Sequence, residues 1–205
     1  LCYMYYCLNN YKKALYTFDK DEESMMTNYN KVRETYFKIF NEIGIEIVAV
    51  AADNGSMGGK NSEEIMAISR IGEDTILFDE KTKQGLNVEV LEKENAEEYL
   101  RETYNIDNVK NLEERKAVEL GHIFALGTKY SDAMDIKYID AENNRQPFYM
   151  GCYGIGVSRL LGLVYENNII KEKDKVIGFS LPVSITPYYL YIISNDNKAP
   201  IAENM

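Results

Sequence analysis

The chain has 205 residues, of which 45% are hydrophobic, so it can build a packed core and is not a wholly disordered protein. Thirty-three acidic residues against 23 basic ones give a net charge of −10, which argues against a protein that binds nucleic acid through its overall charge. No stretch reaches the roughly 18 apolar residues of a membrane-spanning helix. Three cysteines without a Cys-x-x-Cys pair, and a single histidine, argue against a disulfide framework and against a two-histidine metal site.

The first predicted element is a helix over residues 19–43, where apolar side chains recur with helical spacing. Asp19 is the predicted N-cap, and Gly44 stands just past the end, where glycine commonly closes a helix. The apolar run 45–52 predicts a buried strand. The glycine-rich stretch 53–59 predicts either a loop that lets backbone approach a ligand or an ordinary tight turn.

Residues 79–115 differ from their surroundings because they are highly charged and thinly apolar. Such a stretch cannot bury enough surface to form a separate core, so it is predicted to be a surface excursion with one or two helices. The other predicted elements are strands at 66–69 and 74–78, strands near 118–127 and 134–139 with a loop at 128–132, a hairpin tip at 140–145, a strand leading into a helix at about 157–166, and strands at 176–179 and 188–194.

The segment 118–131 contains glycine and polar residues that packing alone does not require. Strict strand alternation places Glu119 on one face and His122 on the other. A carboxylate in an apolar strand is costly unless it is paired or metal-bound, so Glu119 could hold a divalent cation on a nucleotide, or it could be a solvated strand end. His122 could be a ligand or a satisfied core histidine.

A second such segment is 150–162, where three glycines in the order G-x-x-G-x-G precede Ser158 and Arg159 at a predicted helix start. The spacing is neither that of a dinucleotide fingerprint nor that of a phosphate loop. An arginine at a helix start can hold a phosphate with two hydrogen bonds, or it can be a surface residue beside structural glycines.

Taken together and in this order, these segments resemble the bacterial-type prolyl-tRNA synthetases, a family of class II aminoacyl-tRNA synthetases. MGCYGIGVSR (150–159) resembles motif 3 of that family, and VELGHIFALGTKYS (118–131) resembles the segment before it. ADNGSMGGKNSEEIM (52–66) is similar to the family's ADSGAIGG…SHEFM. YTFD (16–19) resembles the end of motif 2, and LPVSITPYYLYII (181–193) resembles the approach to the anticodon-binding domain.

The resemblance implies an α+β fold, a class II synthetase-like and mostly antiparallel sheet flanked by helices and truncated at both ends. It implies a partial catalytic domain over residues 1–187, with 79–115 as a shortened surface insertion in place of an editing domain. Residues 188–205 would begin a truncated anticodon-binding domain. The family's dimer-forming motif 1 and the first strand of motif 2 have no counterpart in the sequence.

The function implied by the resemblance is ATP-dependent activation of proline and its transfer to tRNA(Pro), with ATP and Mg²⁺ required, in the cytoplasm or an organelle and without membrane attachment. Arg159 matches the family's γ-phosphate ligand, with Ser158 beside it at the ATP site, and Glu119 matches the ligand of ATP and magnesium. The remaining expected substrate-binding residues are His122, Phe124, Gly154 and Tyr16.

Two departures from the family leave a second hypothesis open. Asn10 stands where an aromatic side chain would pack on adenine, and Ala14 stands where an acid would face the proline imine. The chain could therefore be a catalytically inactive synthetase-like paralogue, or a gene fragment, that acts as a binding module. The family's members are homodimers, but the absence of motif 1 removes the basis for expecting one here.

Overall fold

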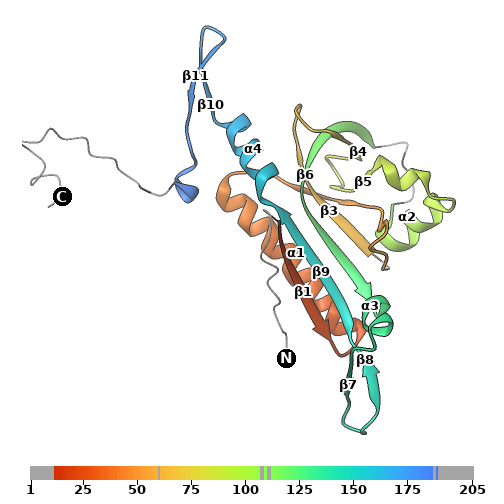
Figure 1. Ribbon diagram of the computed structural model, residues 1–205. Helices are drawn as coiled ribbons and strands as arrows, with labels where there is room; N and C mark the ends of the chain where they lie inside the picture. Colours follow the sequence, from red (N-terminus) through yellow and green to blue (C-terminus); the bar gives the residue numbers. More distant parts are fainter. Residues whose placement is uncertain (1–11, 60, 107–108, 110–111, 187, 189–205) are drawn as a thin grey trace, which may run out of the picture.

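The computed structural model describes residues 12–59, 61–106, 109, 112–186 and 188. A seven-stranded sheet with helices on its outside forms the body, and two small hairpins project from opposite ends (Figure 1). The elements are β1 (Lys12–Asp19), α1 (Glu22–Ile43), β2 (Val48–Ala51), β3 (Asn61–Ile68), β4 (Asp74–Phe78), β5 (Gly85–Asn87), η1 (Val88–Glu92), α2 (Ala96–Tyr104), β6 (Glu113–Gly127), α3 (Lys129–Ala133), β7 (Lys137–Ile139), β8 (Arg145–Pro147), β9 (Tyr149–Gly156), α4 (Val157–Asn167), β10 (Ile169–Glu172), β11 (Lys175–Phe179) and η3 (Val183–Ile185).

The sheet has the strand order β1-β9-β6-β3-β2-β5-β4. Its neighbouring strands are antiparallel, except that β2 and β5 run parallel. Because β4 also pairs with β6, the strands from β6 to β4 close into a circuit. The predicted mostly antiparallel sheet is confirmed, and β6 is its organising strand, paired with β3, β4 and β9.

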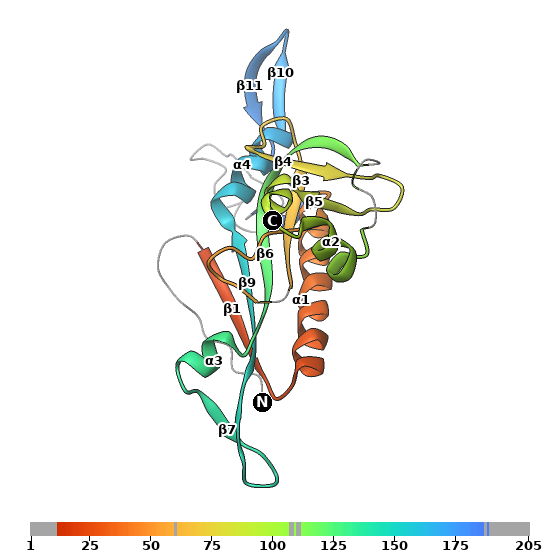
Figure 2. The same ribbon diagram turned by 90° about the vertical axis from the view of Figure 1, so that its right-hand side faces the viewer.

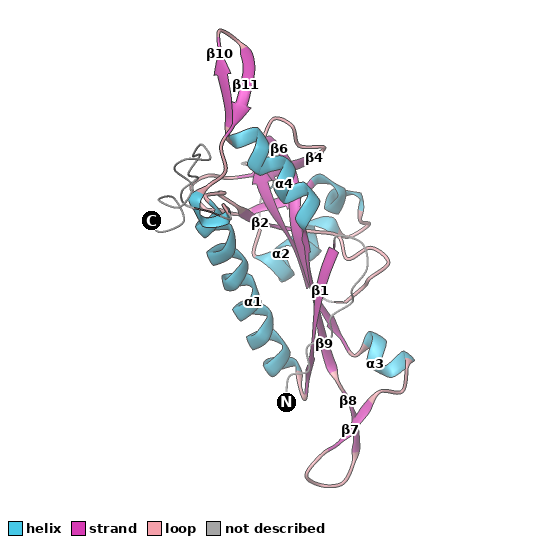
Figure 3. Cartoon of the chain, turned by 60° about the vertical axis from the view of Figure 1, so that its left-hand side comes forward, coloured by secondary structure: helices cyan, strands magenta, loops and turns pink. Residues whose placement is uncertain are grey.

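Helix α1 packs along one face of the sheet, against β1, β6 and β9 (Figure 3). Its apolar stripe is buried there, as helical spacing requires. The buried residues of α1 are Met25, Tyr29, Tyr36 and Phe40.

The N-terminus of α1 corrects one prediction. The N-cap is Asp21, whose carboxylate accepts a hydrogen bond from the backbone N–H of Ser24 at 2.7 Å. Asp19 instead ends β1 and accepts a hydrogen bond from the side chain of Asn28 at 2.6 Å. The strand preceding the helix holds Asp19, so the next aspartate in the sequence performs the capping. Gly44 closes the helix in the left-handed region, with φ of 80°, as predicted.

The segment 79–115 also differs from its prediction. It contributes β5 to the middle of the strand circuit, followed by η1 and α2 (Figure 2). Leu86, Val90 and Leu100 are fully buried in one cluster with Ala51. The expectation that this stretch lies outside the core is wrong, because its few apolar side chains are spaced so that most of them face the sheet.

Several boundaries differ in detail from the predictions. β3 and β6 begin earlier, α3 occupies the expected loop at 128–132, and β10 is an unpredicted partner of β11. The expected strand at 188–194 lies outside the described residues, apart from Tyr188. Among the described helices, none is both long enough and apolar enough to cross a membrane.

Candidate active site

Four neighbouring strands align a row of residues across the sheet. Ala14 on β1 is opposite Gly154 on β9, Gly154 is opposite His122 on β6, and His122 is opposite Glu64 on β3. Because paired residues in a sheet point to the same face, the side chains of His122 and Glu64 lie on one surface. The row therefore brings three of the sequence segments that resemble the synthetase core onto one surface.

The next row lies two residues along each strand and so faces the same way. It consists of Tyr16, Cys152, Phe124 and Ser62. The Phe124 ring stacks on the His122 ring, with centroids 3.8 Å apart and planes inclined by 15°. This stacking fixes the plane of the imidazole.

Helix α1 packs on the opposite face of these strands. Glu63, one residue before Glu64, accepts hydrogen bonds from Tyr29 at 3.0 Å and from Arg33 at 2.9 Å, both on α1. Since successive strand residues alternate, the face that carries Glu64 and His122 points away from that helix. Helix α1 thus covers one face of the sheet, and the candidate site lies on the other face.

A β-bulge places Glu119 in this site. Gly121 is opposite Ile65 and Glu119 is opposite Met66, so Leu120 is an extra residue in β6. The extra residue reverses the alternation, and Glu119 lies on the same face as His122, with Oε1 3.5 Å from Nδ1. The prediction of opposite faces is wrong for this reason, while Leu120 is buried in the core.

Arg159 approaches from the first turn of α4. Its guanidinium donates to the Glu119 carboxylate and, at 3.2 Å, to the Glu119 backbone oxygen. The Arg159 side chain is about half exposed and that of Glu119 a quarter exposed, so the pair lies at an opening. The two charges that the sequence singled out therefore converge, but their roles toward a ligand stay predictions.

A pocket of about 180 Å³ is formed between β6, β9 and α4. At Gly154 no atom lies within 4 Å of the position that a Cβ would occupy, so the strand is open there. Ser158 and Tyr16, which the resemblance assigns to the site, are not among the residues that line this pocket. The lining residues are Glu119, Leu120, Gly121, His122, Phe124, Cys152, Gly154, Ile155, Gly156 and Arg159.

The glycine loop between β2 and β3 lies elsewhere. Gly59 has φ of 101°, and a Cβ there would clash with the backbone oxygen of Ala125. The Lys129 ammonium donates to the backbone oxygens of Ser56 and Met57 at 3.0 Å. These contacts serve packing against the far end of β6, and the loop lines no part of the pocket. Of the two alternatives, they favour the tight turn.

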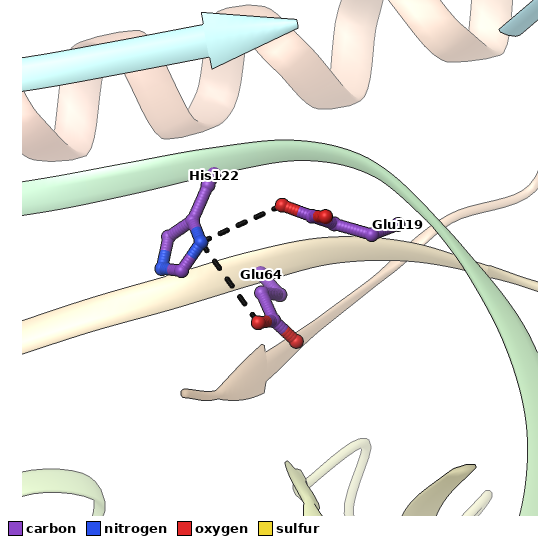
Figure 4. A group of neighbouring side chains, drawn as sticks. All are labelled: Glu64, Glu119 and His122. Atoms are coloured by element: carbon purple, nitrogen blue, oxygen red, sulfur yellow. Dashed lines mark ion pairs between the residues drawn. The ribbon is translucent and has the colours of Figure 1, made fainter. Parts of the chain in front are cut away.

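Glu64 is the site residue that reasoning from strand pattern missed. Its Oε1 lies 3.8 Å from Nδ1 of His122, and ligand atoms of Glu64, Glu119 and His122 all lie within 4.8 Å of one another (Figure 4). Two carboxylate oxygens this close are ligands that a hard divalent cation prefers. The only sequence signal was the match of Glu64 within the glycine-loop segment.

The two carboxylates differ in their electrostatic surroundings. Burial raises the pKa of Glu64, and a hydrogen bond from Asn87 only partly offsets it. Burial also acts on Glu119, but hydrogen bonding to His122 and the charge of Arg159 outweigh it and hold the pKa of Glu119 below its usual value. Environments that push two pKa values apart give neighbouring carboxylates different roles. The pKa of Glu119 is thus lowered and that of Glu64 raised, although both carboxylates lie beside the same imidazole.

Comparison with known proteins agrees with these observations. Residues 11–168 match the family model of the tRNA synthetase class II core domain (G, H, P, S and T). The chain is 33% identical to a proline–tRNA ligase of Ehrlichia canis over 97% of its own length and 48% of that protein. A proline–tRNA ligase of Sulfurimonas denitrificans is 35% identical over 75% of this chain and 38% of that protein.

Among solved structures, the fold is similar to that of a prolyl-tRNA synthetase from Cryptosporidium parvum, determined as a complex with L-proline and AMP. The TM-score is 0.57 at 11% identity, over 94% of this chain and 32% of that one, so the likeness shows the fold. The chain spans about half the length of the curated relatives it matches, or less. With its sheet, its motifs and the match over 11–168, the chain belongs to the class II tRNA synthetase core domain family.

Proposed function

We propose that this chain is the part of a proline–tRNA ligase that binds ATP and proline and activates the amino acid. The observation that carries the proposal is the convergence of Arg159, Glu119, His122 and Gly154 at one pocket. The names of the similar relatives, and the proline and AMP in the similar solved structure, support the choice of substrates.

In the proposed reaction a carboxylate oxygen of proline attacks the α-phosphorus of ATP, and pyrophosphate leaves. The protein contributes positioning and charge neutralisation. Arg159 would bind the γ-phosphate, which requires its present pair with Glu119 to open. Glu119 would hold Mg²⁺, which when bound neutralises phosphate charge. Ser158, one residue before Arg159, would face the same nucleotide.

Proline would lie against the open strand at Gly154, beside the stacked rings of His122 and Phe124. Tyr16 pairs with Cys152 in the neighbouring row and would complete the wall behind these rings. Transfer to tRNA(Pro) and a location in the cytoplasm or an organelle belong to the proposal on the same grounds of resemblance. Both concern the whole protein. The relative from Ehrlichia canis is about twice as long as this chain.

A second candidate function is a binding module that no longer activates proline. Ala14 favours it, because the residue sits in the row of Gly154 and His122, where the resemblance expects an acid to face the proline imine. A substrate charge left without its partner costs roughly 1–3 kcal/mol or more. Such a module would still bind nucleotide through Arg159.

Replacement of Arg159 by alanine is expected to weaken ATP binding about 10- to 100-fold, since a hydrogen bond to a charged group contributes roughly 1.5–3 kcal/mol. Isothermal titration calorimetry with Mg²⁺–ATP measures the effect. Arg145→Ala is the matched control, because Arg145 is an exposed arginine of β8 that pairs with Asp135 outside the pocket. Equal ATP affinities of the two variants would show that Arg159 does not contact the nucleotide.

Proline-dependent ATP–pyrophosphate exchange separates the two candidate functions. The binding module predicts exchange near background from the 205-residue chain, because Ala14 leaves the proline imine without an acidic partner. Robust exchange that Arg159→Ala abolishes would establish the enzyme. Nucleotide binding that depends on Arg159, without exchange, would favour the binding module, and no binding of ATP or proline by a folded chain would overturn both.

Replacement of Gly154 by valine is expected to block the pocket with little effect on thermal stability. The side chain would project into open space, so the fold needs no rearrangement, whereas a ligand would lose room equal to a few methyl groups. We expect proline affinity to fall about tenfold or more. Gly178→Val, on β11 and also without atoms nearby, is the control. A loss of proline affinity in both variants would contradict the placement of proline at Gly154.

A further inference from the structure

A chain of polar contacts runs from the segment 79–115 to the pocket, and it begins at Asn87. This residue ends β5, where the neighbouring Leu86 is held between Ala51 of β2 and Leu77 of β4. Asn87 is 5% exposed. Its amide oxygen accepts a hydrogen bond from the backbone N–H of Glu89 at 3.2 Å, which fixes the orientation of the amide. The amide nitrogen of Asn87 therefore has a defined direction.

That nitrogen donates to Glu64. The distance from Nδ2 of Asn87 to Oε2 of Glu64 is 2.8 Å, and the Glu64 side chain is only 13% exposed. A buried carboxylate needs such a partner, because desolvation without one is costly. With Oε2 engaged by Asn87, the other oxygen, Oε1, is the one that faces His122.

One edge of the His122 imidazole faces the two carboxylates. Its Nδ1 lies 3.8 Å from Oε1 of Glu64 and 3.5 Å from Oε1 of Glu119 (Figure 4). Its Nε2 is buried and has no hydrogen-bond partner within the part of the chain that the structure describes. Stacking on Phe124 fixes the plane of the ring but does not distinguish its two edges. The carboxylates at Nδ1 are therefore what selects one edge.

We propose that Asn87 and Glu64 are positioning residues, which hold the imidazole of His122 in one orientation and keep its proton on Nδ1 at the pocket wall. The segment 79–115 thereby acts on the site without touching its ligand. The role of this His122 orientation in proline binding rests on the proposed function. The contacts themselves exist without any ligand, so they can be tested separately.

The single histidine of the chain makes a direct test possible. With ¹⁵N-labelled histidine, long-range ¹H–¹⁵N spectra of the ligand-free protein at one fixed pH report which ring nitrogen carries the proton. We expect one set of signals with Nδ1 protonated. In Asn87→Leu, which keeps the volume but removes the amide, we expect both ring nitrogen shifts to move toward those of a free imidazole that exchanges between tautomers.

Asn54→Leu is the matched control. Asn54 is another buried asparagine, and its side-chain N–H₂ donates to the backbone oxygen of Gly59 at 2.8 Å, in the glycine loop away from His122. This substitution is expected to leave the imidazole shifts unchanged. If Asn87→Leu does not fold, Glu64→Gln, which keeps the shape but removes the charge facing Nδ1, is expected to move the shifts in the same direction.

Imidazole shifts identical to those of the unsubstituted chain, in a folded Asn87→Leu or Glu64→Gln variant, would overturn the proposal. Equal changes in Asn54→Leu would also overturn it, because the effect would then be a general loss of packing. Neither result involves ATP or proline. Failure of the positioning contacts is thus distinguishable from failure of the proposed function, which the binding and exchange experiments test.

Discussion

Replacement of Phe40 by alanine is expected to lower the free energy of unfolding by about 3–5 kcal/mol. Phe40 is fully buried between α1 and the sheet, in the largest cluster of apolar side chains in the described part of the chain. Its ring meets that of Tyr36 edge to face, with centroids 6.3 Å apart. Truncation removes both the buried area and this aromatic contact and leaves a cavity that rigid strands cannot fill.

Urea unfolding followed by circular dichroism measures this change. Ile39→Ala is the control, because Ile39 precedes Phe40 in the same helix but is 36% exposed. Its expected cost is below about 1 kcal/mol. A similar cost for both variants would mean that α1 does not pack on the sheet as described. The midpoint should shift at an unchanged slope, since the unfolded surface is nearly the same.

Replacement of Leu100 by alanine is expected to cost about 2–5 kcal/mol. Leu100 is fully buried on α2, where it packs with Leu86 of β5 and Val90 of η1. Because β5 lies within the strand circuit, the loss is transmitted to the whole sheet and should appear in global unfolding. A cost of this size is expected only if the segment 79–115 is part of the core and not the surface excursion that the sequence predicts.

The matched control for Leu100 is Leu91→Ala, at a leucine of the same segment that is 40% exposed. Hydrogen exchange adds a second measurement, since amides of β5 should open only with the amides of β6 if the segment belongs to the core. A small cost for Leu100→Ala, together with fast exchange throughout α2, would show a segment that unfolds by itself.

Elements with a strong local pattern could be predicted from the sequence. Helix α1 has a full apolar stripe and a glycine at its end, and α4 follows a glycine-rich strand, so the predicted bounds of both lie within about three residues of the observed ones. The prediction for the segment 79–115 is wrong because burial depends on where side chains point rather than on how many are apolar. Leu86, Val90 and Leu100 suffice, since the sheet supplies the rest of the cluster.

For the candidate site, the sequence identified Glu119, His122 and Arg159 but not how they meet. Strand alternation has a period of two, so a single bulge at Leu120 reverses the direction of every residue on one side of it. Nothing in the local sequence marks that bulge, because it is determined by pairing with β3. The contribution of Glu64 depends on the same pairing and was equally hidden.

The closure of the sheet by β4 has a consequence for its borders. An open sheet has two free edges, each a row of unpaired backbone groups that can recruit another strand. Since β4 is paired with both β5 and β6, the described seven-stranded sheet keeps one such edge, on β1. That edge adjoins the row of Ala14, Gly154 and His122. A strand that docked there would extend the row of Ala14, Gly154 and His122 by one residue on the far side of β1, so the sheet can be widened next to the pocket without any change in the strands that line it.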